Sequence, residues 1–184
     1  MRVTAGKAKG LRLKSPGGAG VRPTSGLVKS ALFSMLAAIP GRMERVVDLY
    51  SGTGALGIEA LSRGAEWVDF VDRDPRNCAL IRENLGLVGY EDKAHVYCST
   101  VDKALSFLAG GYTLVLADPP YEKEDVSKLL TKVAQTGLVE HDGIVAIEHS
   151  THDEIADGYD GLKLIKSRRY GETCISLYQK EQTS

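Results

Sequence analysis

The stretch Val46–Gly57 restricts the possible folds more than any other part of the sequence, because an apolar strand-like run leads into a glycine-rich loop and then into a helical pattern. A βα turn of this kind is typical of parallel sheets that helices cover on both faces. Gly52 and Gly54 allow a tight turn that brings the backbone close to a ligand, and Gly57 allows the helix to pack against the strand. The stretch predicts an α/β fold with a ligand-binding loop.

Strand-like and helix-like segments alternate along the rest of the chain, as in a parallel sheet. The patterns predict strands at 46–50, 67–72, 95–99, 112–118 and 143–148, and helices at about 25–38, 55–63, 75–86, 101–109 and 124–136. Two late strands, at about 162–169 and 173–180, are too close together for a crossover helix and should form an antiparallel hairpin. We expect a mostly parallel, Rossmann-like sheet of seven strands with helices on both faces.

Acidic residues at two predicted strand ends indicate the charge of the ligand. Asp48 lies so close to the glycine loop that it would repel the pyrophosphate of a dinucleotide. S-adenosylmethionine carries a cationic ammonium and a cationic sulfonium, which a carboxylate attracts. Asp72 ends the next strand, where a carboxylate can accept hydrogen bonds from ribose hydroxyls. The pair therefore predicts an S-adenosylmethionine site, the alternative being two solvated acids at strand ends.

A second motif, Asp118-Pro119-Pro120-Tyr121, follows the strand-like run Tyr112–Ala117. The Asp118 side chain and the carbonyls of Asp118 and Pro119 offer acceptors to an NH2 group, and neither proline has an N–H that would compete. Tyr121 offers a ring on which a nucleobase can stack. The motif therefore suits the holding of an amine, although Asp-Pro-Pro can also simply end a strand.

Charge is unevenly distributed, although the net charge is only −1. Residues 1–43 contain eight basic and no acidic side chains, which leaves 15 basic against 24 acidic residues in the remainder. A basic surface of this kind can bind phosphates by releasing counterions, whereas the alternative is a solvated charged tail. Apolar residues alternate around a glycine-containing turn, so residues 1–24 should form a basic N-terminal β-hairpin ahead of a main domain at 25–184.

Several function classes receive no support from the sequence. Cys78, Cys98 and Cys174 are widely spaced and odd in number, which disfavours a disulfide framework and a zinc site. The four histidines show no ligand spacing, and we expect no metal. The start is too polar for a secretory signal, and no apolar run is long enough to cross a membrane, so we expect a cytoplasmic protein.

The chain resembles the RsmD family of 16S ribosomal RNA guanine-N2 methyltransferases. Its central motifs are similar to those of class I methyltransferases that act on nitrogen, and its N-terminal run points to RsmD. The segments that carry the resemblance are Met1–Lys7, Lys9–Leu13, Arg22–Thr24, Val28–Leu36, Asp48–Gly57, Asp118–Tyr121 and Arg169–Thr173. The resemblance implies S-adenosylmethionine as cofactor and 16S rRNA, in a partly assembled small subunit, as partner; a monomer is the default expectation.

The motifs and the resemblance together give three sets of expected site residues. The catalytic set is Asp118, Pro119, Pro120 and Tyr121. The cofactor set is Asp48, Ser51, Gly52, Thr53, Gly54, Gly57, Asp72, Arg73, Thr100 and Val101. The RNA set is Arg2, Lys7, Lys9, Arg12, Lys14, Arg22, Thr24 and Lys29.

Three other functions remain open at this point. The tetrapeptide also suits adenine-N6 methylation of DNA or RNA, although such DNA enzymes generally carry an added target-reading region. A protein-glutamine methyltransferase would more often have Asn where this chain has Asp118. A non-catalytic RNA-binding protein with a relic cofactor pocket is disfavoured because Asp48, Asp72 and Asp118 occur together.

Overall fold

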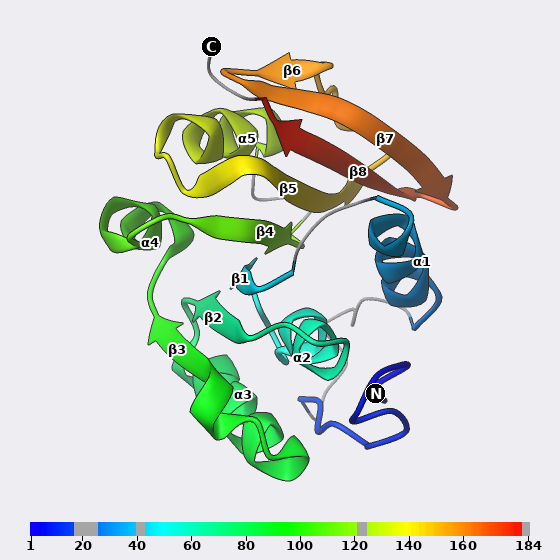
Figure 1. The fold of residues 1–184 in the computed structure, drawn as a ribbon, viewed down its shortest axis with the longest axis vertical. Helices are drawn as coiled ribbons and strands as arrows, with labels where there is room; N and C mark the ends of the chain where they lie inside the picture. The colour runs from blue at the N-terminus through cyan, green and yellow to red at the C-terminus, as the bar shows by residue number, and fades with distance from the viewer. Residues whose placement is uncertain (17–25, 40–42, 121–124, 182–184) are drawn as a thin grey trace.

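The fold is built on one twisted sheet, seen in a computed structural model that describes residues 1–16, 26–39, 43–120 and 125–181. The strands lie in the order β3-β2-β1-β4-β5-β8-β7-β6 (Figure 1). Their bounds are β1 (Arg45–Leu49), β2 (Trp67–Asp72), β3 (Ala94–Cys98), β4 (Tyr112–Ala117), β5 (Val139–Ser150), β6 (Gly158–Tyr159), β7 (Leu162–Tyr170) and β8 (Thr173–Lys180). The first five pair in parallel, and β8 pairs antiparallel with both β5 and β7.

Helices cover both faces of this sheet. They are α1 (Gly26–Ala37), α2 (Ala55–Ser62), α3 (Pro75–Val88), α4 (Val101–Phe107) and α5 (Val126–Gln135), with a short 3-10 helix, η1 (Glu91–Lys93). Apolar residues of α1, α2 and α3 share one core with the sheet, and those of α4 and α5 share another on the opposite face. We call the first side the α1–α3 face.

The expected architecture is confirmed in its main features and corrected in one strand. The parallel strands and the C-terminal antiparallel hairpin are present, and β4 is buried at every position, as expected for a parallel strand covered on both faces. The described sheet has eight strands, not seven. The additional strand is β6, a two-residue segment at the edge beside β7, which is too short to leave a periodic pattern in the sequence.

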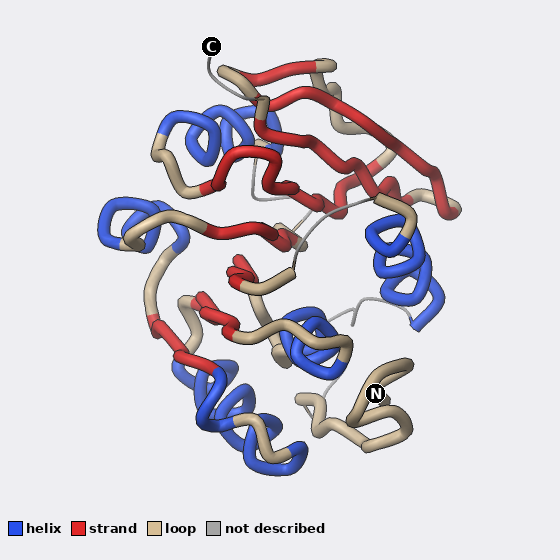
Figure 2. The backbone as a smooth tube through the Cα atoms, in the orientation of Figure 1, coloured by secondary structure: helices blue, strands red, loops and turns tan. Residues whose placement is uncertain are grey.

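The predicted N-terminal β-hairpin is not formed. Arg2 and Arg12 form a single isolated antiparallel bridge, and the backbone around them runs as loops (Figure 2). Gly6 explains why: its φ is +79°, and a Cβ there would come within 1.8 Å of the carbonyl oxygen of Ser62 in α2. The segment is therefore pressed against α2, and it contributes Val3 to the same core.

A buried carboxylate fixes this segment to the main fold. Glu59 of α2 has no exposed surface, and its Oε1 accepts the Thr4 hydroxyl at 2.6 Å while its Oε2 accepts the Thr4 N–H at 2.9 Å. Lys29 of α1 lies 3.0 Å from Oε2 and donates a hydrogen bond to the Arg2 carbonyl at 2.7 Å. Arg63 also donates to Oε1, at 2.9 Å. One acid thus joins α1, α2 and the N-terminal segment.

Candidate functional site

The predicted site lies where three neighbouring parallel strands end. Asp48 of β1 is in register with Phe70 of β2 and with Leu116 of β4, and all three occupy the α1–α3 face of the sheet. Side chains two residues apart on a strand share a face, so Asp72 and Asp118, each two residues further on, point to that face as well. The register therefore brings the three predicted carboxylates together at the carboxyl edge of the sheet.

Burial and neighbouring charge act together on Asp48, which is only 1% exposed. Its pKa is raised to about 8, and burial is the largest cause; the charges of Asp118 and Asp72 add to the rise, and the N–H of Gly57 opposes it by donating a hydrogen bond at 2.9 Å. The influence of both acids on Asp48 shows that they lie near it. A cation placed at this edge would relieve the repulsion among the three carboxylates.

The glycine loop takes the conformation that the sequence predicted. Gly52 and Gly54 have φ angles of +55° and +78°, and Tyr50 just before them has +57°. At Gly57 a Cβ would lie 2.3 Å from the ring of Phe70, so only glycine lets α2 approach β2 this closely. The positive φ of Tyr50 marks a strained position at the start of the loop.

Ser51 and Thr53 support the loop from within. The Ser51 hydroxyl donates to the Asp48 carbonyl at 2.5 Å and accepts the N–H of Val71 at 2.9 Å, which ties the loop to the end of β2. Thr53 is buried, and its carbonyl accepts a hydrogen bond from Asn84 of α3 at 2.9 Å. Both predicted residues therefore lie in the loop, where they hold its shape.

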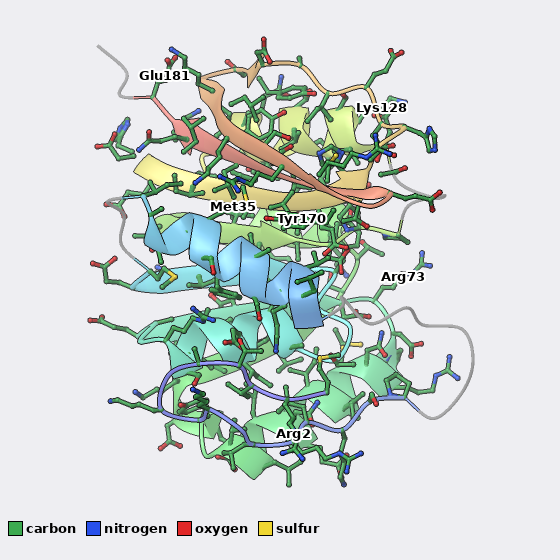
Figure 3. All side chains as sticks on the ribbon, turned by 90° about the vertical axis from the view of Figure 1, so that its right-hand side faces the viewer. Arg2, Met35, Arg73, Lys128, Tyr170 and Glu181 are labelled. Atoms are coloured by element: carbon green, nitrogen blue, oxygen red, sulfur yellow. The ribbon has the colours of Figure 1, made fainter. Side chains whose placement is uncertain are left out.

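Asp72 connects the loop to the start of α3. Its Oδ2 accepts the N–H of Gly52 at 2.8 Å, and its Oδ1 accepts the N–H of Asp74 at 2.8 Å and the side chain of Asn77 at 3.2 Å. Arg73 is exposed and extends from the edge of the molecule (Figure 3). The structure thus places Asp72 at the site and leaves Arg73 at its rim.

The other predicted cofactor residues follow the next strand. Thr100 is exposed and caps α4 by accepting the N–H of Lys103 at 3.3 Å. Val101 is buried in the core beneath α4. They come just after β3, at the same carboxyl edge as Asp72, which is in register with Cys98.

The predicted catalytic tetrapeptide is described up to its third residue. Asp118 is partly buried, Pro119 is buried and Pro120 is exposed directly after β4. Tyr121 lies outside the described residues. Sequence reasoning missed Glu148, which lies in the buried run of β5, directly after the apolar stretch 143–147. The same signal, an acid at the end of an apolar strand, could have found it.

The predicted RNA residues divide into three groups. Arg2, Lys7, Lys9 and Arg12 are exposed on the N-terminal segment, and Arg2 is visible there in Figure 3; Lys14 is exposed but forms an ion pair with Glu83. Arg22 and Thr24 lie outside the described residues. The assignment of Lys29 is corrected: it is 1% exposed and paired with Glu59, so it cannot reach a phosphate.

Two further observations concern metal binding and membrane-spanning helices. Within the described ranges, no three His, Cys, Asp or Glu side chains are grouped so that they could hold a metal ion. No helix in the described part of the chain is both long and apolar enough to span a membrane.

Comparison with known proteins finds relatives that match nearly the whole length of this chain. A family described as "Conserved hypothetical protein 95" matches residues 1–179. The "Putative rRNA methyltransferase YlbH" of Bacillus subtilis (strain 168) is 35% identical over 184 residues, covering 98% of this chain and 99% of the relative. "Ribosomal RNA small subunit methyltransferase D" of Escherichia coli (strain K12) is 27% identical, covering 98% and 90%. A solved structure of a hypothetical protein from Thermus thermophilus has 30% identity and a TM-score of 0.83, covering 96% and 98%.

Proposed function

Because this chain belongs to the Conserved hypothetical protein 95 family of S-adenosylmethionine-dependent methyltransferases, we propose that it methylates the exocyclic N2 of a guanine in 16S ribosomal RNA. The observation that carries the proposal is the position of Asp118, which directly follows β4 and lies on the same face as Asp48 and Asp72. A methyl acceptor held at Asp118 would lie directly beside a cofactor held by the other two.

The residues at the end of β1 and β2 fit this cofactor chemically. Asp48 is a buried carboxylate among like charges, so a ligand with ammonium and sulfonium groups would offset its unfavourable environment. Asp72 is an acceptor suited to ribose hydroxyls, and the N–H groups of the glycine loop can meet a carboxylate. When bound, the cofactor supplies an electrophilic methyl group on its sulfonium.

The described part of the Asp-Pro-Pro motif can prepare an amine to attack that methyl group. The nitrogen N2 of guanine is a poor nucleophile because its lone pair is delocalised into the ring. If Asp118 and the Pro119 carbonyl accept its two N–H bonds, the nitrogen is held with its lone pair directed at the methyl group. The positive charge that develops on nitrogen is stabilised by Asp118, and a proton then leaves to Asp118 or to water.

RNA binding is assigned to the basic N-terminal segment. Arg2, Lys7, Lys9 and Arg12 are exposed on a loop structure that packs against α2, the helix that begins at the glycine loop. Phosphates held there would set the position of the RNA without choosing the base. We propose that Arg22 and Thr24 extend this surface and that Tyr121 stacks on a base that has left its helix.

We expect cofactor affinity to depend on Asp48 and on pH. Because a raised pKa keeps Asp48 largely protonated below pH 8, binding of a cation should release a proton, and affinity should rise by up to about tenfold per pH unit towards pH 8. In Asp48→Asn this rise should disappear, and affinity at pH 8 should fall by about 1–3 kcal/mol. Calorimetric titration of both proteins from pH 6 to pH 8 tests this. The amine of the cofactor titrates equally in the two experiments, so any difference between the two pH profiles comes from the protein. If affinity depends on pH in the same way in the wild type and in Asp48→Asn, Asp48 does not belong to the cofactor site.

Neutral substitutions should separate RNA binding from folding. Deleting the N-terminal segment would also break the hydrogen bonds of Thr4 with Glu59, so the variant Lys7→Gln, Lys9→Gln and Arg12→Gln is the cleaner test. It should bind RNA more weakly, and its salt dependence should flatten by about 0.7–0.9 in slope for each phosphate that is no longer bound. Filter-binding titrations at several salt concentrations measure this, with Lys93→Gln in η1 as the control. An unchanged slope in the triple variant would contradict a phosphate-binding role.

The reaction itself is tested by product analysis. Labelled S-adenosylmethionine would be incubated with the protein and with undermethylated small ribosomal subunits, free rRNA, DNA or protein. Label in rRNA as N2-methylguanosine, identified by mass spectrometry of nucleosides, supports the proposal. Label at adenine N6 or in protein would assign the same site to a different acceptor, and label in none of them would favour a non-catalytic protein.

A further inference from the structure

Glu148 stands beside Asp118 at the carboxyl edge of the sheet. The strands β4 and β5 pair in parallel with Leu116 opposite Ala146, and the pairing continues to the last residue of β4. One step further along the same register, Asp118 is opposite Glu148. Because Leu116 and Ala146 both belong to the core of the α1–α3 face, the two acids that follow them by two residues are directed to that face.

The burial of Glu148 makes it notable. It is 9% exposed, at the end of a run in β5 that is otherwise apolar up to Ile147. A buried carboxylate next to a reaction site is a candidate functional group. The strand order β2-β1-β4-β5 puts Glu148 on the side of Asp118 away from the predicted cofactor residues. That side is where the remainder of a substrate base must lie when its amine is at Asp118.

The edge of guanine offers two adjacent donors, the ring N1–H and the N2 amine. We infer that Glu148 accepts the N1–H of the target guanine while Asp118 accepts from the N2 amine, an inference that rests on the proposed function. Adjacent strands are about 4.8 Å apart, and glutamate is one methylene longer than aspartate, so the two carboxylates can reach neighbouring atoms of one base.

This arrangement selects guanine and rejects adenine. Adenine also has an exocyclic amine, but the ring nitrogen beside it carries a lone pair in place of a hydrogen. Opposite Glu148 that lone pair would face a carboxylate oxygen, so the adenine ring nitrogen would find an acceptor where it needs a donor. Sites built around a substrate N–H reject analogues that lack it far more strongly than apolar pockets reject a change of size. Glu148 is therefore a specificity-determining residue, and Asp118 remains the group that acts on the amine.

The nucleobase 2-aminopurine provides a sharp test, because it keeps the 2-amino group and replaces the N1–H with a lone pair. Small-subunit particles would be reconstituted with rRNA that carries guanosine or 2-aminopurine riboside at the target position. Wild-type protein should prefer guanosine in kcat/KM by about 10- to 100-fold. In Glu148→Gln the amide can accept from N1–H or donate to the lone pair, so the preference should shrink about tenfold or more.

Controls separate this role from folding and from the proposed function. Glu140→Gln, at the exposed amino end of the same strand, should keep the wild-type preference. Intrinsic differences between the two bases cancel, because the ratio is compared between proteins. If Glu148→Gln keeps the full preference while methylating guanosine, Glu148 does not read N1. If wild-type protein forms no N2-methylguanosine, the proposed function fails and this inference fails with it.

Discussion

Replacement of Asp118 by alanine should lower the rate of methyl transfer by about 10²- to 10³-fold, the scale for losing one group that stabilises charge developing in a transition state. Cofactor affinity should not fall, because the charge of Asp118 raises the pKa of Asp48 and its removal makes Asp48 easier to ionise. RNA affinity should also change little, because the phosphates are assigned to the N-terminal segment. The loss would therefore appear in the chemical step and leave binding intact.

Single-turnover methylation with saturating cofactor and RNA measures that step. Asp118→Asn is the matched variant, since its amide oxygen can still accept one N–H bond while the negative charge is lost. Its rate should lie between those of the wild type and of Asp118→Ala. If Asp118→Ala transfers methyl at the wild-type rate, the Asp-Pro-Pro motif only ends β4.

Replacement of Glu59 by alanine should lower the free energy of unfolding by about 3–5 kcal/mol, the range for removing one partner of a buried ion pair. Lys29 is 1% exposed and would lose the carboxylate that lies 3.0 Å from its Nζ. The N–H and the hydroxyl of Thr4 in the N-terminal segment would each lose the carboxylate oxygen to which they donate. Denaturant unfolding followed by circular dichroism measures this change. The double variant Glu59→Leu, Lys29→Met should be less destabilised than Glu59→Ala, because the two changes together remove both charges of the buried pair. If both variants lose the same free energy of unfolding, the loss does not come from an unpaired charge on Lys29.

Acid should act on the same pair in a predictable direction. Burial alone would raise the pKa of Glu59, but hydrogen bonds from Thr4 and the nearby Lys29 outweigh it and hold the pKa below its usual 4.5. For an acid with a lowered pKa, the stabilisation is complete above the unfolded-state value and disappears as the pH falls through the folded-state value. The difference in stability between the wild type and Glu59→Ala should therefore narrow below pH 4.5.

Local patterns were sufficient wherever the structure depends on neighbouring residues in the chain. The parallel strands could be predicted because strands buried on both faces are apolar at nearly every position, as β4 is. The glycine loop could be predicted because its turn and the close approach of Gly57 to Phe70 exclude most side chains. Asp48, Asp72 and Asp118 were placed together correctly because parallel strands end at one edge of the sheet.

Two predictions that were wrong concerned parts of the fold that depend on contacts between distant segments. Alternating residues at the start of the chain suggested a hairpin, but Thr4 and Ala5 bond to Glu59, 55 and 54 residues away, and Gly6 fits against α2. Lys29 looked like part of a basic surface, because composition cannot show that a charge is buried beside a distant acid.

The sequence by itself determined the α/β class, the glycine loop and the acids at the ends of β1, β2 and β4, because periodicity and turn chemistry are local properties. Only the tertiary structure decided which charged residues face the site. Strand register placed Glu148 beside Asp118, although 30 residues separate them in the chain. Helix packing removed Lys29 from the surface and joined it to Glu59. Register and packing depend on residues far apart in the chain, so the position of each charge could be read only from the folded protein.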